Sequence, residues 1–217
     1  MYRDRSVGKK RTKTGGLPAK RFKRPTIIKR YEGGELKFHD TATNGTVTTT
    51  GLLLDNIPTG IANGTGESER IGRQITGTRL NLNGVFTLPA SAANTSDVVR
   101  LMVVQDKQCN GALFTSAELL QLGTSFLSYR NLENAKRFEV FCDERIVLDS
   151  KMQTAAATAG AVTHYFKKSI NLRDMVFEYS GVTGSITDLK SNNLAVYLIS
   201  EKGFIVCDLY TRLRYRG

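Results

Sequence analysis

Side chains that bind metals or form disulfide frameworks are scarce in this sequence. Its 217 residues include two histidines, His39 and His164, and three cysteines. Cys109, Cys142 and Cys207 lack the CxxC spacing that clamps zinc, and an odd number of thiols favours a reducing compartment over a fully paired disulfide framework. We therefore expect no metal site, and we expect Cys142 and Cys207 to pack as small apolar residues.

Signatures of catalysis are also missing from the sequence. It holds no G-x-S-x-G nucleophile elbow, no Walker loop and no dinucleotide fingerprint. The adjacent acids Asp143 and Glu144 would lie on opposite faces of a strand, so they cannot act as a facing carboxylate pair. We therefore expect a protein that is not an enzyme and that uses no cofactor.

Long apolar runs are absent, which disfavours insertion into a membrane. No run approaches the length needed to cross a bilayer, and the first thirty residues lack the apolar core of a secretory signal. A mitochondrial presequence would need an amphipathic helix, which Gly8, Gly15, Gly16, Pro18 and Pro25 would interrupt. We expect no membrane insertion.

Acidic residues are nearly absent from the first thirty positions. That stretch holds twelve of the 31 Lys and Arg residues but only one of the 20 acids, Asp4, so residues 31–217 carry 19 of each and are neutral. A basic segment joined to a neutral body is typical of a nucleic-acid-binding tail. Because its few apolar residues follow no helix or strand period, we expect residues 1–34 to form an arm that is disordered when free.

The arm supplies the predicted nucleic-acid-binding residues. Its bases can neutralise phosphates without reading sequence. Phe22 can stack on unpaired bases, which favours single strands; Tyr31 either stacks in the same way or begins the folded body. Two basic clusters, residues 9–11 and 20–24, are also spaced like a bipartite nuclear-import signal, which would add an import receptor as a partner. The predicted site residues are Arg3, Arg5, Lys9, Lys10, Arg11, Lys13, Lys20, Arg21, Phe22, Lys23, Arg24, Lys29 and Arg30.

Residues 35–217 are patterned as one all-β domain. In residues 80–88 the even positions are apolar or glycine, which predicts a strand with one buried face. Ile71 and Ile75 have the opposite parity, so we expect a β-bulge around Gly77. Residues 138–149 and 205–215 also alternate, and their apolar positions should face a core. Further strands are expected near residues 47–54, 164–172 and 175–179.

Two segments, 98–104 and 194–199, are apolar on both faces of the predicted strand. Such strands are covered on both sides or lie at an interface between subunits. Helix is scarce: Thr115 and Glu118 have the spacing of a capping box and predict a helix over residues 116–122, and residues 131–136 suggest one more helical turn. About eight strands separated by turn-rich stretches indicate an antiparallel sandwich.

The order of these features is similar to that of a known protein family. A basic arm is followed by a run of strands, then by a short polar segment ending in Arg137-Phe138-Glu139-Val140 at the start of a strand, and finally by closing strands at 194–199 and 204–215. This order resembles the capsid (coat) proteins of small circular single-stranded DNA viruses, of the geminivirus kind. The Cys and His cluster described for some geminivirus coats has no counterpart here, so no role of that cluster is carried over.

The resemblance implies an eight-stranded antiparallel jelly-roll sandwich that assembles into a closed icosahedral shell. The simplest shell has about 60 copies. It also implies that the arm points inward and packages a single-stranded DNA genome, and that the protein occupies the virion and, during assembly, the host nucleus. The expected organisation is an arm at residues 1–34 and a capsid domain at 35–217.

Three other functions remain open at this point. A coat protein of a small single-stranded RNA or satellite virus would use the same arm and fold. A cellular nucleic-acid-binding protein, such as a ribosomal protein, could also carry a basic tail, although its basic charge usually continues over the body, which is neutral here. An enzyme tethered by its tail to nucleic acid or to an anionic membrane is the third, and it lacks a recognisable site.

Overall fold

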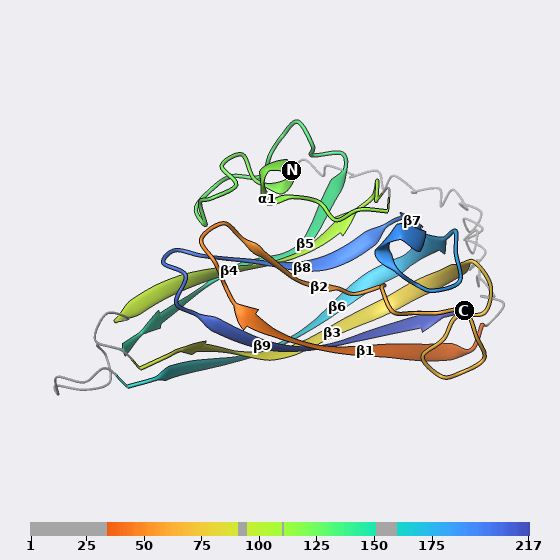
Figure 1. Ribbon diagram of the computed structural model, residues 1–217, viewed down its shortest axis with the longest axis horizontal. Coiled ribbons are helices and arrows are strands. Elements are labelled where there is room, and N and C mark those ends of the chain that lie inside the picture. The colour runs from red at the N-terminus through yellow and green to blue at the C-terminus, as the bar shows by residue number, and fades with distance from the viewer. Residues whose placement is uncertain (1–33, 91–94, 110, 151–159) are drawn as a thin grey trace, which may run out of the picture. The chain divides into compact units, whose positions relative to one another are not determined.

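Two antiparallel sheets build the part of the chain that the computed structural model describes, residues 34–90, 95–109, 111–150 and 160–217 (Figure 1). The first sheet, sheet A, has the spatial order β1 (Leu36–Thr46), β9 (Val206–Arg216), β3 (Gln74–Leu88), β6 (Val162–Tyr179) and β7 (Leu189–Ser191). The second, sheet B, has the order β2 (Leu52–Asn56), β8 (Asn193–Ser200), β4 (Ser96–Asp106) and β5 (Phe138–Asp149). The helical pieces are short: α1 (Ser116–Leu119) and the 3-10 turn η2 (Ile186–Asp188).

The strand order is that of a jelly roll. Apart from the three-residue β7, each sheet takes four strands, and the first strand pairs with the last along its whole length, from Leu36 with Arg216 to Thr46 with Val206. Consecutive strands mostly lie in different sheets, as the two nested Greek keys of a jelly roll require. The fold class expected from the sequence is confirmed.

The main core lies between the two sheets, where β3, β6 and β9 face β4 and β8. Two glycines of β3 open space in it. A Cβ at Gly84 would lie 2.7 Å from the ring of Phe166, and a Cβ at Gly77 would lie 2.7 Å from the ring of Phe177. Because Gly84 is small, Phe166 lies across β3 and stacks on Phe86, with 4.7 Å between the ring centroids.

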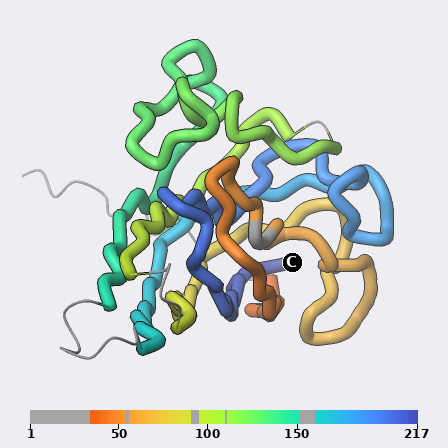
Figure 2. Tube along the Cα trace, turned by 60° about the vertical axis from the view of Figure 1, so that its left-hand side comes forward, coloured from red at the N-terminus to blue at the C-terminus, as the bar shows by residue number. Residues whose placement is uncertain are grey.

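A second, smaller core lies on the other side of sheet B, under the segment that joins β4 to β5 and contains α1 (Figures 1 and 2). Met102 of β4 and Tyr197 of β8 point into it, whereas their neighbours Val103 and Val196 point into the main core. The strands predicted to be apolar on both faces are therefore covered on both faces within one chain.

The β-bulge expected around Gly77 is confirmed. The register of β3 against both β6 and β9 shifts between Gly77 and Arg79, so Ile75 and Leu80 both face the core despite their opposite parity. Ile71 lies outside the strand and is 57% exposed, so its expected burial was wrong.

Strand β6 corrects the sequence-based expectation of two strands at 164–172 and 175–179. The interruption is a bulge: Arg173 and Asp174 adopt left-handed φ values of 53° and 59°, and the Arg173 amide donates to the Asn171 side-chain oxygen. Because pairing with β3 resumes at Met175, the strand continues through the bulge.

Strand β5 does not present one apolar face, which corrects the expectation for residues 138–149. Its register against β4 shifts between Val103 and Val104, so the apolar side changes sheet face partway along the strand. Phe138 and Val140 pack in the second core, whereas Ile146 and Leu148 pack in the main core.

Strand β1 was not predicted from the alternation of apolar residues, and the strand expected at 47–54 is found at Leu52–Asn56.

The helix expected over 116–122 is the shorter α1, and its capping box is confirmed: the Glu118 amide donates to the Thr115 hydroxyl oxygen, and the Thr115 amide donates to the Glu118 carboxylate. Residues 133–137 form turns.

Candidate nucleic-acid interface

The thirteen nucleic-acid-binding residues predicted in the arm, Arg3 to Arg30, lie outside the described residues. Tyr31 also lies outside them. Their roles therefore stay predictions from the sequence. The chain enters the described unit just before β1, at one edge of sheet A.

The outer face of sheet A is an exposed and mostly polar surface. Side chains alternate along each strand, so the register places residues of β1, β9, β3 and β6 side by side in four rows. The rows are Phe38, Arg214, Arg79 and Asn171; Asp40, Arg212, Asn81 and Ser169; Ala42, Tyr210, Asn83 and Lys167; and Asn44, Asp208, Val85 and Tyr165.

Positive charge exceeds negative charge in these rows. They hold four cations, Arg79, Lys167, Arg212 and Arg214, and two acids, Asp40 and Asp208. Such an excess attracts an anionic partner, although it is modest beside that of the arm.

One of the four cations, Arg212, forms an ion pair with a neighbouring carboxylate. Arg212 donates to both carboxylate oxygens of Asp40, at 2.7 and 2.6 Å, and its guanidinium lies 4.9 Å from the centre of the Phe38 ring. The hydrogen bonds from Arg212 lower the pKa of Asp40 below its ordinary value. Within the described residues, the side chains of Arg79, Lys167 and Arg214 have no ion pair, so their charges are open to a ligand.

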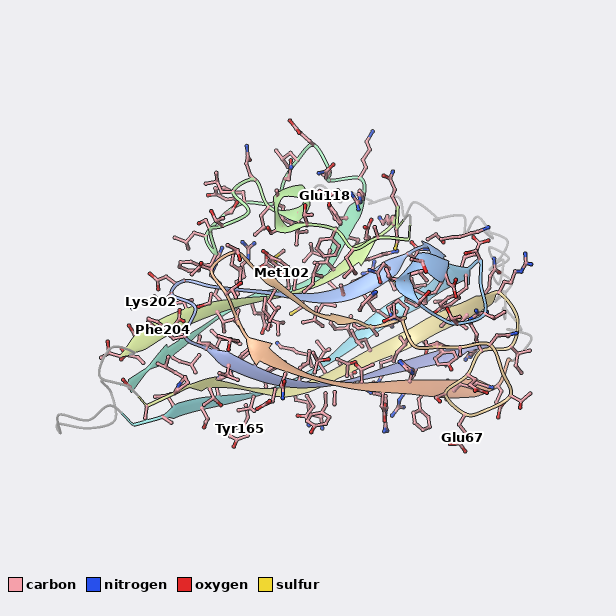
Figure 3. All side chains as sticks on the ribbon, in the orientation of Figure 1. Glu67, Met102, Glu118, Tyr165, Lys202 and Phe204 are labelled. Atoms are coloured by element: carbon pink, nitrogen blue, oxygen red, sulfur yellow. The ribbon has the colours of Figure 1, made fainter. Side chains whose placement is uncertain are left out.

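Two tyrosines stand out from the same face. Tyr165 is 78% exposed and Tyr210 is 63% exposed. Tyr165 points away from sheet B into solvent (Figure 3). Exposed aromatic rings beside cations are the combination on which unpaired bases stack in single-strand-binding proteins.

Two hollows meet at Tyr210. One, of about 610 Å³, is lined by residues of β1, β9, β3 and β6, among them Asn81, Asn83, Lys167 and Arg212. The second, of about 550 Å³, lies toward Asn44, Val85 and Asp208. Tyr210 lines both, so the two hollows are neighbours on this face.

Sequence reasoning did not find this face as a site. It placed Asn81, Asn83, Asp208, Arg212 and Arg214 on the polar sides of their strands, which the structure bears out. It had no signal for which strands are neighbours. Tyr210 and Asn83, for example, are register partners although they are 127 positions apart in the chain.

The opposite side of the unit is organised by two arginines that hold the β4–β5 segment on sheet B. Arg100 donates to both carboxylate oxygens of Asp143 at 2.7 Å and to the Ser128 carbonyl at 2.6 Å. These hydrogen bonds lower the pKa of Asp143. Arg137 donates to Asp106 at 2.7 Å and to Glu118 at 2.6 Å, which raises the pKa of the guanidinium.

The three cysteines are free thiols that are buried or half-buried. Cys207 is fully buried, and burial raises its pKa to about 12, so the thiol stays protonated at neutral pH. Burial also raises the pKa of Cys109 and Cys142. In the described ranges, no group of three or more His, Cys, Asp or Glu residues is placed to hold a metal ion, and no helix is long and apolar enough to span a membrane.

Comparison with known proteins finds likeness only among solved structures. No protein-family model matches the chain, and no curated protein matches it. A chain of Desmodium yellow mottle tymovirus is 9% identical with a TM-score of 0.31, over 88% of this chain and 95% of that one. A chain of the Kashmir bee virus empty particle at acidic pH is 11% identical with a TM-score of 0.29, over 98% and 83%.

A third neighbour is a chain of the Israeli acute paralysis virus full particle, 12% identical with a TM-score of 0.27, over 97% of this chain and 79% of that one. All three names are of viruses and none is a geminivirus, so the geminivirus-like relation stays a prediction. At such low identities and TM-scores these neighbours carry no weight for function. The jelly-roll assignment depends on strand order and register instead.

Proposed function

We propose that this chain is a viral coat protein that assembles into a closed shell and packages a single-stranded genome through its basic arm. The observation that carries the proposal is that the net charge and the folded unit lie in different parts of the chain. A jelly-roll unit with balanced charge is joined, at the first strand of sheet A, to a segment that holds the whole net charge of +11.

The two parts suit two different physical tasks. A jelly roll protects most strand edges within its two sheets and leaves loops and sheet faces for contacts between copies. A flexible arm can follow an irregularly coiled polyanion, and each Lys or Arg that binds a phosphate releases condensed counterions. In a shell of about 60 copies the arms would bring on the order of 660 positive charges to the genome.

Within this proposal we expect the genome to be single-stranded DNA, and the coat of a small single-stranded RNA or satellite virus is the alternative. Phosphate contacts position a chain without reading its bases, so the same arm chemistry serves either polymer. The basic clusters at 9–11 and 20–24 would also serve nuclear import before assembly in the host nucleus.

A cellular nucleic-acid-binding protein is the candidate from another class. It would bind nucleic acid through the same arm but would remain a small complex. The deciding property is therefore closed assembly rather than binding.

Electron microscopy of the purified full chain, mixed with circular single-stranded DNA or with RNA of equal length, tests the proposal. We expect uniform closed particles whose nucleic acid resists nuclease. Soluble complexes of one or a few copies, without particles under any assembly condition, would refute the coat function. Particles that protect RNA but not DNA would replace the DNA expectation with its alternative.

A further inference from the structure

The outer face of sheet A carries exposed tyrosine rings, cations without an ion pair and asparagine side chains close together, and no described element covers it. We propose that this face is a second nucleic-acid site, where Tyr210 and Tyr165 stack on unpaired bases while Lys167, Arg79 and Arg214 contact phosphates. Because its occupant is a single-stranded nucleic acid, this site deepens the function proposed above and rests on it.

Tyr210 is the centre of the site. Tyr210 lines two neighbouring hollows of about 610 and 550 Å³. Asn83 lies between Tyr210 and Lys167 in the same row. A base on the Tyr210 ring would therefore have an amide beside it for hydrogen bonds and an ammonium group beyond that for a phosphate.

Tyr165 extends the site along the sheet. It lies two strands away from Tyr210 and one row further on. The spacing between β-strands and the rise along them place the two Cα atoms roughly 12 Å apart. A few nucleotides of single-stranded nucleic acid can therefore reach both rings. Arg79 and Arg214 lie in the first row, on the other side of Tyr210 from Tyr165. They are register partners, and their side chains have no ion pair in the described residues, so they extend the positively charged surface in that direction.

The composition of the face favours nucleic acid over a second copy of the chain. The centre of a protein interface is depleted in charged residues, whereas the two middle rows hold Asp40, Arg212 and Lys167 beside only one small apolar residue, Ala42. The bidentate bonds from Arg212 neutralise Asp40, which leaves the three open cations against Asp208 alone.

The site would also orient the subunit. If the genome is inside the shell, the outer face of sheet A looks inward, and the second core with the β4–β5 segment looks outward. The described chain begins just before β1, an edge strand of this sheet.

The test compares two full-length variants that differ in where the aromatic rings are removed. One carries Tyr165→Ala and Tyr210→Ala; the control carries Tyr129→Ala, which removes an 86% exposed ring from the β4–β5 segment. Affinity for oligo(dT) is measured in about 0.5 M NaCl, where the arm's electrostatic contribution is screened. Loss of stacking should weaken binding of the double variant roughly tenfold or more, with no change for Tyr129→Ala.

Two further measurements separate stacking from packing. Tyr165→Phe with Tyr210→Phe keeps the rings and should keep the affinity. Lys167→Ala should lower the slope of log affinity against log salt by about 0.7. A duplex of the same length should show no response to the tyrosine changes, because its bases are already stacked.

Unchanged oligo(dT) affinity in the alanine double variant, beside a large loss when Lys20, Arg21, Lys23 and Arg24 are replaced by Ala, would overturn this site and leave the arm function standing. Loss of particles without loss of affinity would also overturn it, because the face would then be an interface between copies. Absence of particles and of binding in the unaltered chain would instead refute the proposed function itself.

Discussion

At the scale of single residues, the described unit depends on a few arginines whose hydrogen bonds tie loops to sheets. Arg70 is 1% exposed; its Nε donates to the Ile61 carbonyl at 3.1 Å, and its guanidinium lies 4.3 Å from the centre of the Tyr179 ring. It also donates to the carbonyls of Gly72 and Gly181, so one side chain joins three segments. A buried cation satisfied in this way stabilises the positions of loops that lie outside the named strands.

The Arg100–Asp143 pair predicts a dependence of stability on pH. Hydrogen bonds from Arg100 lower the pKa of Asp143 below its ordinary value of 3.8. A carboxyl whose folded pKa is depressed contributes stability that is fully present above 3.8 and is lost as the pH falls through the lowered folded pKa. Urea unfolding followed from about pH 6 to about pH 2.5 should therefore give a lower free energy of unfolding below pH 3.8 than above it.

The control for this prediction is Asp143→Asn, which removes the titrating group and keeps the shape. Its stability should be lower at neutral pH, and its loss of stability on acidification should be smaller than that of the unaltered protein. Equal acid sensitivity of the two proteins would assign the effect to other carboxyls, such as Glu118, whose pKa is also lowered, first by the Thr115 backbone amide.

At the scale of elements, β5 joins two cores because a bulge turns its apolar side from one sheet face to the other. Its first residues, Phe138 and Val140, pack under the β4–β5 segment, where the rings of Phe138 and Phe114 meet edge to face at 5.1 Å. Its last residues close one end of the main core. Damage to the first part of β5 should therefore release the β4–β5 segment before it disturbs the sandwich.

Val140→Asp tests this division. A carboxylate placed among Met102, Val104 and Ala195 has no partner in the second core, and we expect it to destabilise the unit by about 2 kcal/mol. Limited proteolysis should then cut within residues 107–137 while the sheets stay folded, which circular dichroism would show.

Glu139→Lys is the matched control on the neighbouring position. Glu139 makes a half-exposed ion pair of 2.9 Å with Lys107, and such pairs are worth at most about 1 kcal/mol. The variant should melt close to the unaltered protein and keep the segment protected. A soluble, protease-resistant Val140→Asp beside an insoluble Glu139→Lys would mean that the inward face of this part of β5 has been assigned the wrong way round.

At the scale of the whole molecule, charge and apolar patterning belong to different parts of the chain. Removal of residues 1–30 takes away the whole net charge and leaves every described strand. We expect the truncated protein to keep its β-sheet circular dichroism and to purify nearly free of nucleic acid, as the ratio of nucleic-acid to protein absorbance would report. Loss of the β signal would contradict the separation of arm and fold.

A full-length variant gives a quantitative test of the arm's role in binding. It replaces Lys20, Arg21, Lys23 and Arg24 by Ala. Each phosphate that the arm no longer neutralises should flatten the slope of log affinity against log salt by about 0.7, so the four changes together should flatten it by roughly three. A strong preference for one oligonucleotide sequence would argue for base reading by the arm and against simple charge neutralisation.

The sequence by itself determined the properties that are local or additive along the chain. Net charge is a sum, and alternation between buried and exposed side chains has a period of two, so the basic arm, the all-β class and the bulge at Gly77 could be predicted without knowing the partners of any strand. The apolar faces of β4 and β8 and the capping box of α1 are of the same kind. A weakly apolar strand such as β1 was not detected, since its inward positions include His39, Thr41 and Thr43.

Only the tertiary structure decided which strands are neighbours. β1 is a strand because it pairs with β9 along eleven positions, and the outer face of sheet A exists because β9, β3 and β6 bring together side chains from distant parts of the chain. The turn of β5 toward a second core was equally out of reach, since one extra residue in a bulge reverses the faces without changing the alternation. Pairing depends on long-range packing of the two sheets, and no period within a strand encodes it.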